Sequence, residues 1–382
     1  MSHALRTRAL AGTGLIGLAL ITACGSGGSS DENTVRVGLS GAFSGPIAYY
    51  GQDSEKGIEI AIEQLSEQTD LPEFELVTAD DECTPQGGAA AFRRLIDVEQ
   101  VDVILGSPCS GATLGGMPVV ADSEVPAMTF GSTNSKISED SGVGGNAYMW
   151  RMNIDDAIMG TAWAAYIADQ GVTSAAIYAA NNDFGRGAAD LYETYLPEVG
   201  IDVVATEFFE LGTSDMRASL TKIDQSGAQA LVVMSEPADC ALMIRQIREI
   251  GMDIKVYGRG GCATAEMIGA LGDPTLADGV MEASYWAPTE DQDEFVNAYQ
   301  AEHDMAAPYN AALGYYGMMT IAEAVAAGGN DPASIQEALS EVDWTSGIGP
   351  ITFDDHNQAH PHMFILEIVD GAVDVLDVVS TS

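Results

Sequence analysis

Short apolar runs alternate with longer segments in which apolar residues recur at helical spacing. In the first part of the chain, the runs predict strands at 35–39, 74–79 and 101–105, and the periodic segments predict helices at 51–65 and 85–98. Such alternation is typical of right-handed βαβ crossovers that build a parallel, doubly wound sheet.

A second series of elements begins after a short strand at 148–152. Strands are expected at 175–179, 203–208, 230–234 and 255–258, with helices at 155–168, 184–195, 214–224 and 238–250. One sheet cannot easily hold all of these strands. We therefore expect two lobes, each with its own sheet, and the later helices at 291–303, 311–326 and 332–339 must join one of them.

Two strand ends carry small polar residues. The buried run 103–105 breaks at Gly106, and Ser110, Gly111 and Thr113 supply hydroxyl groups and backbone N–H groups where the next helix starts. A helix start of this kind suits a carboxylate, although an ordinary helix cap has the same pattern. The strand at 127–130 ends in a second polar turn, Gly131-Ser-Thr-Asn134.

The first 24 residues differ from the rest. Arg6 and Arg8 precede an apolar run at 9–21 that is too short to span a bilayer, and Ile21-Thr-Ala-Cys24 resembles the lipobox of bacterial lipoproteins. We predict a signal peptide at 1–23, a lipidated Cys24 at the start of a flexible tether at 24–33, and an extracytoplasmic location at the cell membrane. The alternative is an ordinary secretory signal.

The mature chain is strongly acidic. Removal of the signal leaves 13 Lys and Arg against 57 Asp and Glu, a net charge of −44. Nucleic acid is therefore not expected as a partner, because its phosphates would be repelled. The acids are spread along the chain, which favours a hydrated surface at high salt, and a salty habitat is a hypothesis.

The cysteines agree with export. With Cys24 set aside, Cys83 and Cys109 both follow strands of the first sheet, and Cys240 and Cys262 both follow strands of the second. Strand ends of one parallel sheet lie at the same edge, so the spacing predicts disulfides Cys83–Cys109 and Cys240–Cys262. Buried free thiols are the alternative, and no CxxC motif supports zinc.

Signatures of enzymes and cofactors are absent from the sequence. There is no GxxxxGK[ST], GxSxG or HExxH motif, and no GxGxxG motif between a strand and a helix. His356, His360 and His362 are interpreted as part of a solvated loop rather than a metal site, and Asp80-Asp81 as a strand-end cap. We expect no cofactor and no metal.

Several short motifs follow one another in a fixed order along the chain. They are Val35-Arg-Val-Gly-Leu-Ser-Gly-Ala-Phe-Ser-Gly-Pro46 with Tyr50-Gly51 and Lys56-Gly57, Asp80-Asp81 with Cys83 and Pro85, Cys109-Ser110 with Ala112-Thr113-Leu114, Val125-Pro126, Ser132-Thr133-Asn134, Asp183-Phe184-Gly185, and Gly349-Pro350-Ile-Thr-Phe-Asp354. Taken together, they resemble the leucine/isoleucine/valine-binding family of ABC-transporter solute receptors.

The resemblance implies a type I periplasmic-binding fold: two Rossmann-like α/β lobes with parallel sheets, joined by three crossovers and closing on a ligand. Lobe 1 would comprise 34–152 plus 287–345, and lobe 2 would comprise 153–286 plus 346–382. The crossovers would lie near Met152, near Trp286 and at 344–348.

By position, the resemblance also implies ligand contacts in lobe 1. Ser110, Thr133 and the backbone at Cys109 and Gly131 would hold a ligand carboxylate, and Tyr50 would line the pocket. These positions lie at the strand ends that the residue pattern itself singles out.

Lobe 2 departs from the family pattern. Phe184 stands where the family often has tyrosine, Glu236 lies near a position that is often aromatic, and Gly260 replaces the acid that binds the ligand ammonium. Either Glu236 supplies that acid and the ligand is an amino acid, or Arg259 faces the cleft and binds a carboxylate, dicarboxylate or amide. Arg259 as a surface residue after a strand is the third possibility.

The resulting functional hypothesis is a monomeric, membrane-tethered receptor that binds a small carboxylate-bearing ligand, such as a branched-chain or other amino acid, and docks on an ABC permease. A ligand sensor without a permease is the alternative on the same fold. An enzyme ranks last, because no nucleophile, base pair or cofactor motif supports it.

Overall fold

The structure, a computed structural model, describes residues 33–289 and 292–381. The predicted signal peptide, Cys24 and nearly all of the predicted tether lie outside the described residues. Within them, no helix has the length and apolar character needed to cross a membrane.

The first sheet is entirely parallel. It has the strand order β2-β1-β3-β4-β5 and comprises β1 (Thr34–Gly41), β2 (Glu73–Asp80), β3 (Val103–Gly106), β4 (Ala127–Thr129) and β5 (Met149–Arg151). The connecting helices are α1 (Tyr49–Ser66), α2 (Pro85–Arg93), α3 (Ser110–Ser123) and the short α4 (Lys136–Glu139). The helix predicted at 85–98 ends as an α-helix at Arg93 and continues as the π-helical turn Arg94–Val98.

The second sheet is mostly parallel and has the order β14-β13-β10-β9-β8-β6-β7. Its strands are β6 (Ser174–Ala180), β7 (Asp202–Phe209), β8 (Ala230–Met234), β9 (Lys255–Arg259), β10 (Met281–Ser284), β13 (Met363–Val369) and β14 (Ala372–Val379). The helices of this region are α5 (Asp156–Asp169), α6 (Asp183–Glu198), α7 (Arg217–Ser226), α8 (Pro237–Glu249), α9 (Ala265–Leu271) and the 3₁₀ turn Pro274–Ala277. In this sheet the pairs β10–β13 and β13–β14 are antiparallel, and the other pairs are parallel.

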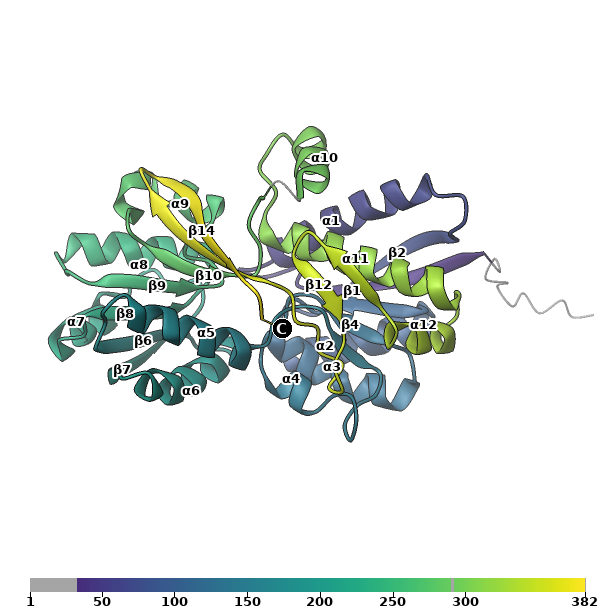
Figure 1. The fold of residues 1–382 in the computed structure, drawn as a ribbon, viewed down its shortest axis with the longest axis horizontal. Helices are drawn as coiled ribbons and strands as arrows, with labels where there is room; N and C mark the ends of the chain where they lie inside the picture. Colours follow the sequence, from purple (N-terminus) through teal and green to yellow (C-terminus); the bar gives the residue numbers. More distant parts are fainter. Residues whose placement is uncertain (1–32, 290–291, 382) are drawn as a thin grey trace, which may run out of the picture. The chain divides into compact units, whose positions relative to one another are not determined.

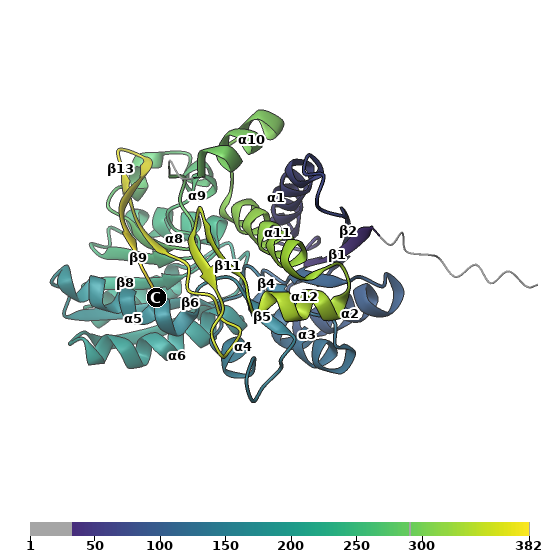
Figure 2. The same ribbon diagram turned by 45° about the vertical axis from the view of Figure 1, so that its right-hand side comes forward.

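The chain returns to the first sheet after β10. The remaining elements are α10 (Asp293–His303), α11 (Tyr309–Gly328), α12 (Pro332–Leu339) and a separate hairpin of β11 (Asp343–Ser346) and β12 (Gly349–Thr352). Helix α11 lies along α1, although the two are far apart in sequence (Figures 1 and 2). The backbones approach so closely that a Cβ atom on Gly57 would lie 1.9 Å from the carbonyl oxygen of Ala311.

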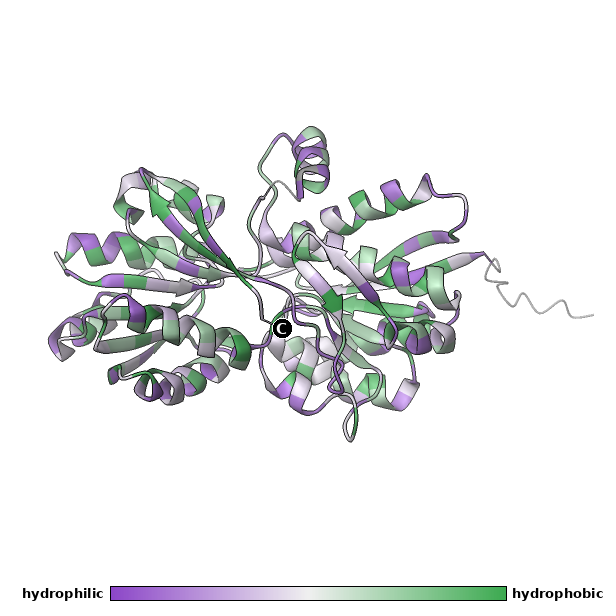
Figure 3. Ribbon diagram, in the orientation of Figure 1, coloured by the Kyte–Doolittle hydropathy of each residue, from purple (hydrophilic) through white to green (hydrophobic). Residues whose placement is uncertain are grey.

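Alternate residues of the central strands face two different layers of helices, as a doubly wound sheet requires. In β3, Val103 and Leu105 belong to the core beneath α1 and α11, whereas Ile104 packs with α2 and α3. In β8, Val232 shares a core with α5 and α6, and Leu231 packs with α7 and α8. Figure 3 shows the hydrophobic colouring of these strands. The expected α/β class is confirmed, while the residue boundaries of the lobes stay a prediction.

Where the chain leaves the first sheet, a buried polar cluster surrounds Arg151. Its guanidinium pairs with Asp155 and donates hydrogen bonds to the side chains of Ser138 and Gln358. Gln358 belongs to the segment that leads from β12 to β13, so the cluster joins this segment to the end of β5. These partners offset the cost of burying a charge.

Candidate ligand-binding cleft

A cleft with about 580 Å³ of empty space, part of it open solvent, lies at the carboxyl ends of strands from both sheets. The turns after β3, β4, β6, β8 and β9 line it together with the starts of α1 and α11. Seven of the eight predicted ligand residues are in its lining, namely Tyr50, Cys109, Ser110, Gly131, Thr133, Phe184 and Glu236. Arg259 is not, although its neighbour Gly260 is.

The first-sheet wall is built around the start of α3. Cys109 has an extended backbone at the N-cap, and no side chain caps the N–H groups of the first turn. The Ser110 hydroxyl lies 3.4 Å from the backbone nitrogens of both Thr133 and Asn134, so the two strand-end turns meet. Uncapped N–H groups at a helix start form a site for an anion.

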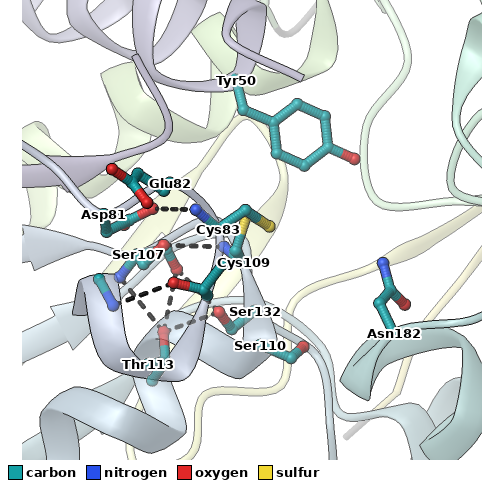
Figure 4. Close-up of a disulfide and its surroundings, with 12 residues drawn as sticks. Tyr50, Asp81, Glu82, Cys83, Ser107, Cys109, Ser110, Thr113, Ser132 and Asn182 are labelled. Carbon is teal, nitrogen blue, oxygen red and sulfur yellow. Dashed lines mark hydrogen bonds between the residues drawn. A yellow bond between two sulfur atoms is a disulfide. The ribbon is translucent and has the colours of Figure 1, made fainter. Parts of the chain in front are cut away.

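A disulfide stiffens this wall. Cys83 and Cys109 are joined by an S–S bond of 2.07 Å, and Figure 4 shows it below the Tyr50 ring. Asp81 helps to fix the position of Cys83, because its carboxylate accepts hydrogen bonds of 2.8 Å from the Cys83 N–H and the Ser40 hydroxyl. The second bond, Cys240–Cys262, is also present, with an S–S distance of 2.06 Å. Both predicted disulfides are therefore confirmed.

The Thr113 hydroxyl does not face the cleft as the sequence suggested. It lies 2.8 Å from the Ser132 hydroxyl and 3.2 Å from the Ser107 carbonyl oxygen. That carbonyl also accepts hydrogen bonds from Thr129 at 2.6 Å and Ser132 at 2.8 Å. Figure 4 shows Thr113 and Ser132 beside Ser107. Thr113 holds the turn in place instead of lining the site, because the buried Ser107 carbonyl needs donors.

Glu236 is the buried acid of the second-sheet wall. It is 5% exposed at the N-cap of α8 and accepts hydrogen bonds from the hydroxyls of Tyr50 and, at 3.2 Å, Tyr49. The Tyr309 hydroxyl in turn donates to Tyr50 at 2.6 Å. These bonds join α1, α8 and α11 across the cleft.

Burial controls the protonation of this group. Removal from water raises the pKa of Glu236 to about 7, although the hydrogen bonds from Tyr50 and Tyr49 oppose the rise. Burial and the nearby Glu236 carboxylate raise the pKa of Tyr50 and Tyr309 well above their ordinary values. The tyrosine hydroxyls therefore stay protonated and act as donors.

Arg259 lies beneath the floor of the cleft. It is 0% exposed and forms an ion pair with Asp156 at the start of α5. Its guanidinium lies 5.4 Å from the centroid of the Phe184 ring and donates a 3.2 Å hydrogen bond to the Tyr285 hydroxyl. Of the three possibilities for Arg259, the exposed surface residue is excluded, because the side chain is buried and Asp156 and two aromatic rings compensate its charge. Phe184 separates this pair from the ligand space.

Sequence reasoning missed other lining residues. Asn182 and Asp183 follow β6, and Asp183 accepts a 2.8 Å hydrogen bond on its carbonyl oxygen from the Asn134 side chain across the cleft. This turn has the same strand-end pattern as the others, so the same rule would have found it. Tyr285 and Tyr309 lie in the segments that pass between the sheets, where no sequence pattern marks them.

The charges of the lining are all negative. Glu236 and Asp183 contribute carboxylates, and no Lys, Arg or His side chain of the described residues lines the cleft. Among these residues there is also no group of three or more His, Cys, Asp or Glu able to hold a metal ion. His360 instead lies 3.0 Å from the Asp354 carboxylate, in a part of the fold away from the cleft.

A model of the periplasmic binding protein family matches residues 34–372. The chain belongs to this family. An amino acid binding protein of Pseudomonas aeruginosa is 27% identical over 332 residues, covering 85% of this chain and 87% of that protein.

Two solved structures place the fold in the same class. A leucine-binding protein, LivK, from Thermotoga maritima has a TM-score of 0.82 at 23% identity and covers 91% of this chain and 99% of its own. An R. palustris solute-binding protein in complex with benzoate has a TM-score of 0.82 at 17% identity. The match covers 91% of this chain and 96% of the R. palustris chain. The expected type I fold is confirmed. This family member is a periplasmic solute-binding protein, a receptor and not an enzyme.

Proposed function

We propose that this protein captures a small zwitterion, an amino acid in the broad sense, for an ABC permease. The ligand carboxylate lies at the start of α3, and its cationic group pairs with Glu236. The observation that carries the proposal is Glu236 itself: a wholly buried acid in the cleft lining whose hydrogen-bond donors are neutral tyrosines.

A buried carboxylate without a cation is costly, and the cost falls when a ligand brings a positive charge. Among the described residues, no Lys, Arg or His lines the cleft to provide a cation. The charge of Arg259 is compensated by Asp156 and shielded from the cleft by Phe184. A dicarboxylate is therefore disfavoured, since its second carboxylate would meet Glu236 and Asp183 without a positive partner.

The opposite wall suits the ligand carboxylate. The first-turn N–H groups of α3 have no side-chain cap, and the turn at Gly131 and Thr133 adjoins them. A helix start attracts negative charge through its dipole and unpaired N–H groups. A zwitterion thus meets backbone donors at the start of α3 and the Glu236 carboxylate on the opposite wall, with the Asp183 carboxylate close to Gly111 as a second acid.

The relatives support two ligand classes. The Pseudomonas aeruginosa relative is named for amino acids and the Thermotoga maritima structure for leucine, whereas the R. palustris structure holds benzoate. An aromatic acid is the second candidate here, because Tyr50, Phe184, Tyr285 and Tyr309 line the cleft. It lacks a cation for Glu236, which is why we place it second.

Calorimetry with wild type and Glu236→Gln tests the proposal, after a thermal-shift screen of amino acids, benzoates and dicarboxylates. The amino acid that raises the melting temperature should bind Glu236→Gln tenfold to a hundredfold more weakly. Glu63→Gln, on the exposed face of α1, is the matched control and should bind like wild type. Tight binding of benzoates with no binding of any amino acid would overturn the proposal in favour of the second candidate.

The location outside the cytoplasm agrees with the family, and we infer that Cys24 carries a lipid anchor that holds a monomeric receptor near its permease. Cys24→Ser should move the protein from the membrane fraction to the soluble fraction or leave it unprocessed. A variant that stays membrane-bound at the wild-type mature mass contradicts the anchor. A neighbouring gene set without a permease would favour the sensor alternative.

A further inference from the structure

Three tyrosine rings in the cleft lining adjoin one another, and two of them, Tyr50 and Tyr309, lie next to Glu236. The ring centroids of Tyr50 and Tyr309 are 6.1 Å apart with planes at 85°, and those of Tyr309 and Tyr285 are 6.4 Å apart at 43°. Rings at such angles are not stacked on one another; they border a common space. Phe184 also lines this space.

The hydroxyls of these tyrosines already have protein partners. Tyr50 donates to Glu236, Tyr309 donates to Tyr50, and Tyr285 accepts from Arg259. The two side-chain hydrogen bonds that Glu236 accepts both end on its Oε2 atom. In this part of the cleft, which is rich in aromatic surface, Glu236 therefore offers mainly its Oε1 atom to the N–H groups of a ligand.

The number of N–H groups on the ligand cation then matters. A primary ammonium has three N–H donors, and each one left without an acceptor on burial is costly. A methylated ammonium keeps the positive charge, has fewer or no donors, and is attracted by the faces of aromatic rings. A buried carboxylate beside several rings suits the second kind of cation.

The positive charge of the protein does not oppose such a cation. The Arg259 guanidinium lies 5.4 Å from the ring centroid of Phe184 and 5.8 Å from that of Tyr285, and its ion pair with Asp156 offsets its positive charge there. The Glu236 carboxylate, which is hydrogen-bonded to Tyr50, adds a negative charge beside the rings. Both the rings and the acid therefore attract a cation toward the same part of the cleft.

We propose that the cationic end of the ligand is an N-methylated ammonium, so that the receptor prefers carboxylates of the betaine class to amino acids with a primary ammonium. The proposal rests on the proposed function, because it concerns the group that pairs with Glu236. It assigns Tyr50, Tyr285 and Tyr309 as the residues that determine this specificity.

A methylation series tests the proposal on the wild-type protein. Glycine, sarcosine, N,N-dimethylglycine and glycine betaine differ only in the number of N-methyl groups, and 4-aminobutyrate with its trimethylammonium counterpart repeats the comparison at a longer spacing. Calorimetry should show affinity that rises with methylation and is at least tenfold higher for the trimethylated member of one series. Affinity that falls tenfold or more on methylation overturns the proposal.

A matched pair of variants separates the ring from its hydroxyl. Tyr309→Leu should weaken binding of the trimethylated probe about tenfold, whereas Tyr309→Phe, which keeps the ring, should stay within about threefold of wild type. Unliganded melting temperatures control for folding, and the wild-type series decides the question if Tyr309→Leu does not fold. Equal binding by both variants and wild type contradicts a role for the ring.

The outcomes distinguish the two proposals. If primary amino acids bind and their methylated forms do not, the preference for methylated ammonium is wrong and the amino acid receptor stands. If no zwitterion of either kind binds or raises the melting temperature, both proposals fail.

Discussion

The two walls of the cleft are made in different ways. The first-sheet wall consists of backbone N–H groups and small hydroxyl residues at two neighbouring strand ends, stiffened by the Cys83–Cys109 disulfide. The second wall depends on side chains from distant segments: Glu236 reaches tyrosines of α1, and Arg259 reaches Asp156 across 103 residues of sequence. In the function that we propose, the first wall binds the carboxylate that ligands of many kinds share, and the second wall selects among them.

The two walls also differ in how their residues contribute to the stability of the folded protein. Backbone donors at a helix start are positioned by the helix itself, so no single side chain is essential there. The second wall buries charges, and each buried charge depends on a particular partner. Substitutions should therefore affect folding more in the second wall than in the first.

Arg259→Ala should give the largest effect. The variant leaves the Asp156 carboxylate buried without its cation, and we expect the free energy of unfolding to fall by about 3–5 kcal/mol. Chemical denaturation measures it. The double variant Asp156→Leu/Arg259→Met should recover much of the loss because no unpaired charge remains. A single variant as stable as wild type would mean that the second wall does not depend on this pair.

The two disulfides compare the walls directly. Replacing either cysteine pair by serine should lower the free energy of unfolding by about 3 kcal/mol, because both bonds close loops of similar length, with sequence separations of 26 and 22. Only Cys83→Ser/Cys109→Ser should also weaken ligand binding, since Cys83 and Cys109 line the cleft and the other pair does not. Denaturation and calorimetry on both double variants give the two readouts. Equal losses of affinity would contradict the distinction.

The role of Glu236 in the second wall can be tested through the pH dependence of folding stability. Its pKa is raised from 4.5 to about 7 by burial, so the protonated form is favoured in the folded state. Its contribution to stability is present in full below pH 4.5 and is lost as pH rises through 7, a change of about 3 kcal/mol. Glu282 has a pKa raised in the same direction to about 7, also by burial.

Comparison of unfolding curves between pH 4.5 and pH 8 measures this loss of stability. Glu236→Gln should make the loss smaller, and the part that comes from Glu282 should remain.

A cationic ligand favours the carboxylate form of Glu236, so its affinity should rise over the same pH interval in wild type and stay flat in Glu236→Gln. A wild-type affinity that falls as pH rises would indicate a ligand that binds protonated Glu236.

Much of the first wall could be predicted from the sequence, because carboxyl ends of parallel strands meet at one edge of a sheet. That rule alone places Ser110 beside Thr133. It does not place Tyr309, whose position depends on the packing of α11 against α1 at Gly57, a tertiary contact without a local signal. Nor does the rule predict that Arg259 is buried in an ion pair, because its partner Asp156 lies in a distant segment of the chain.

Ser110→Ala should give the smallest effect and so completes the comparison of the two walls. The hydroxyl lies 3.4 Å from two backbone nitrogens, a weak contact in the absence of ligand, and we expect the free energy of unfolding to change by less than about 1 kcal/mol. A ligand carboxylate at the start of α3 would lose one charge-assisted hydrogen bond but keep the backbone N–H groups, which gives about a tenfold loss of affinity. Calorimetry with the ligand found in the screen measures it, with Ser123→Ala at the far end of α3 as the control. A loss as large as that of Glu236→Gln would show that the first wall, too, depends on a single side chain.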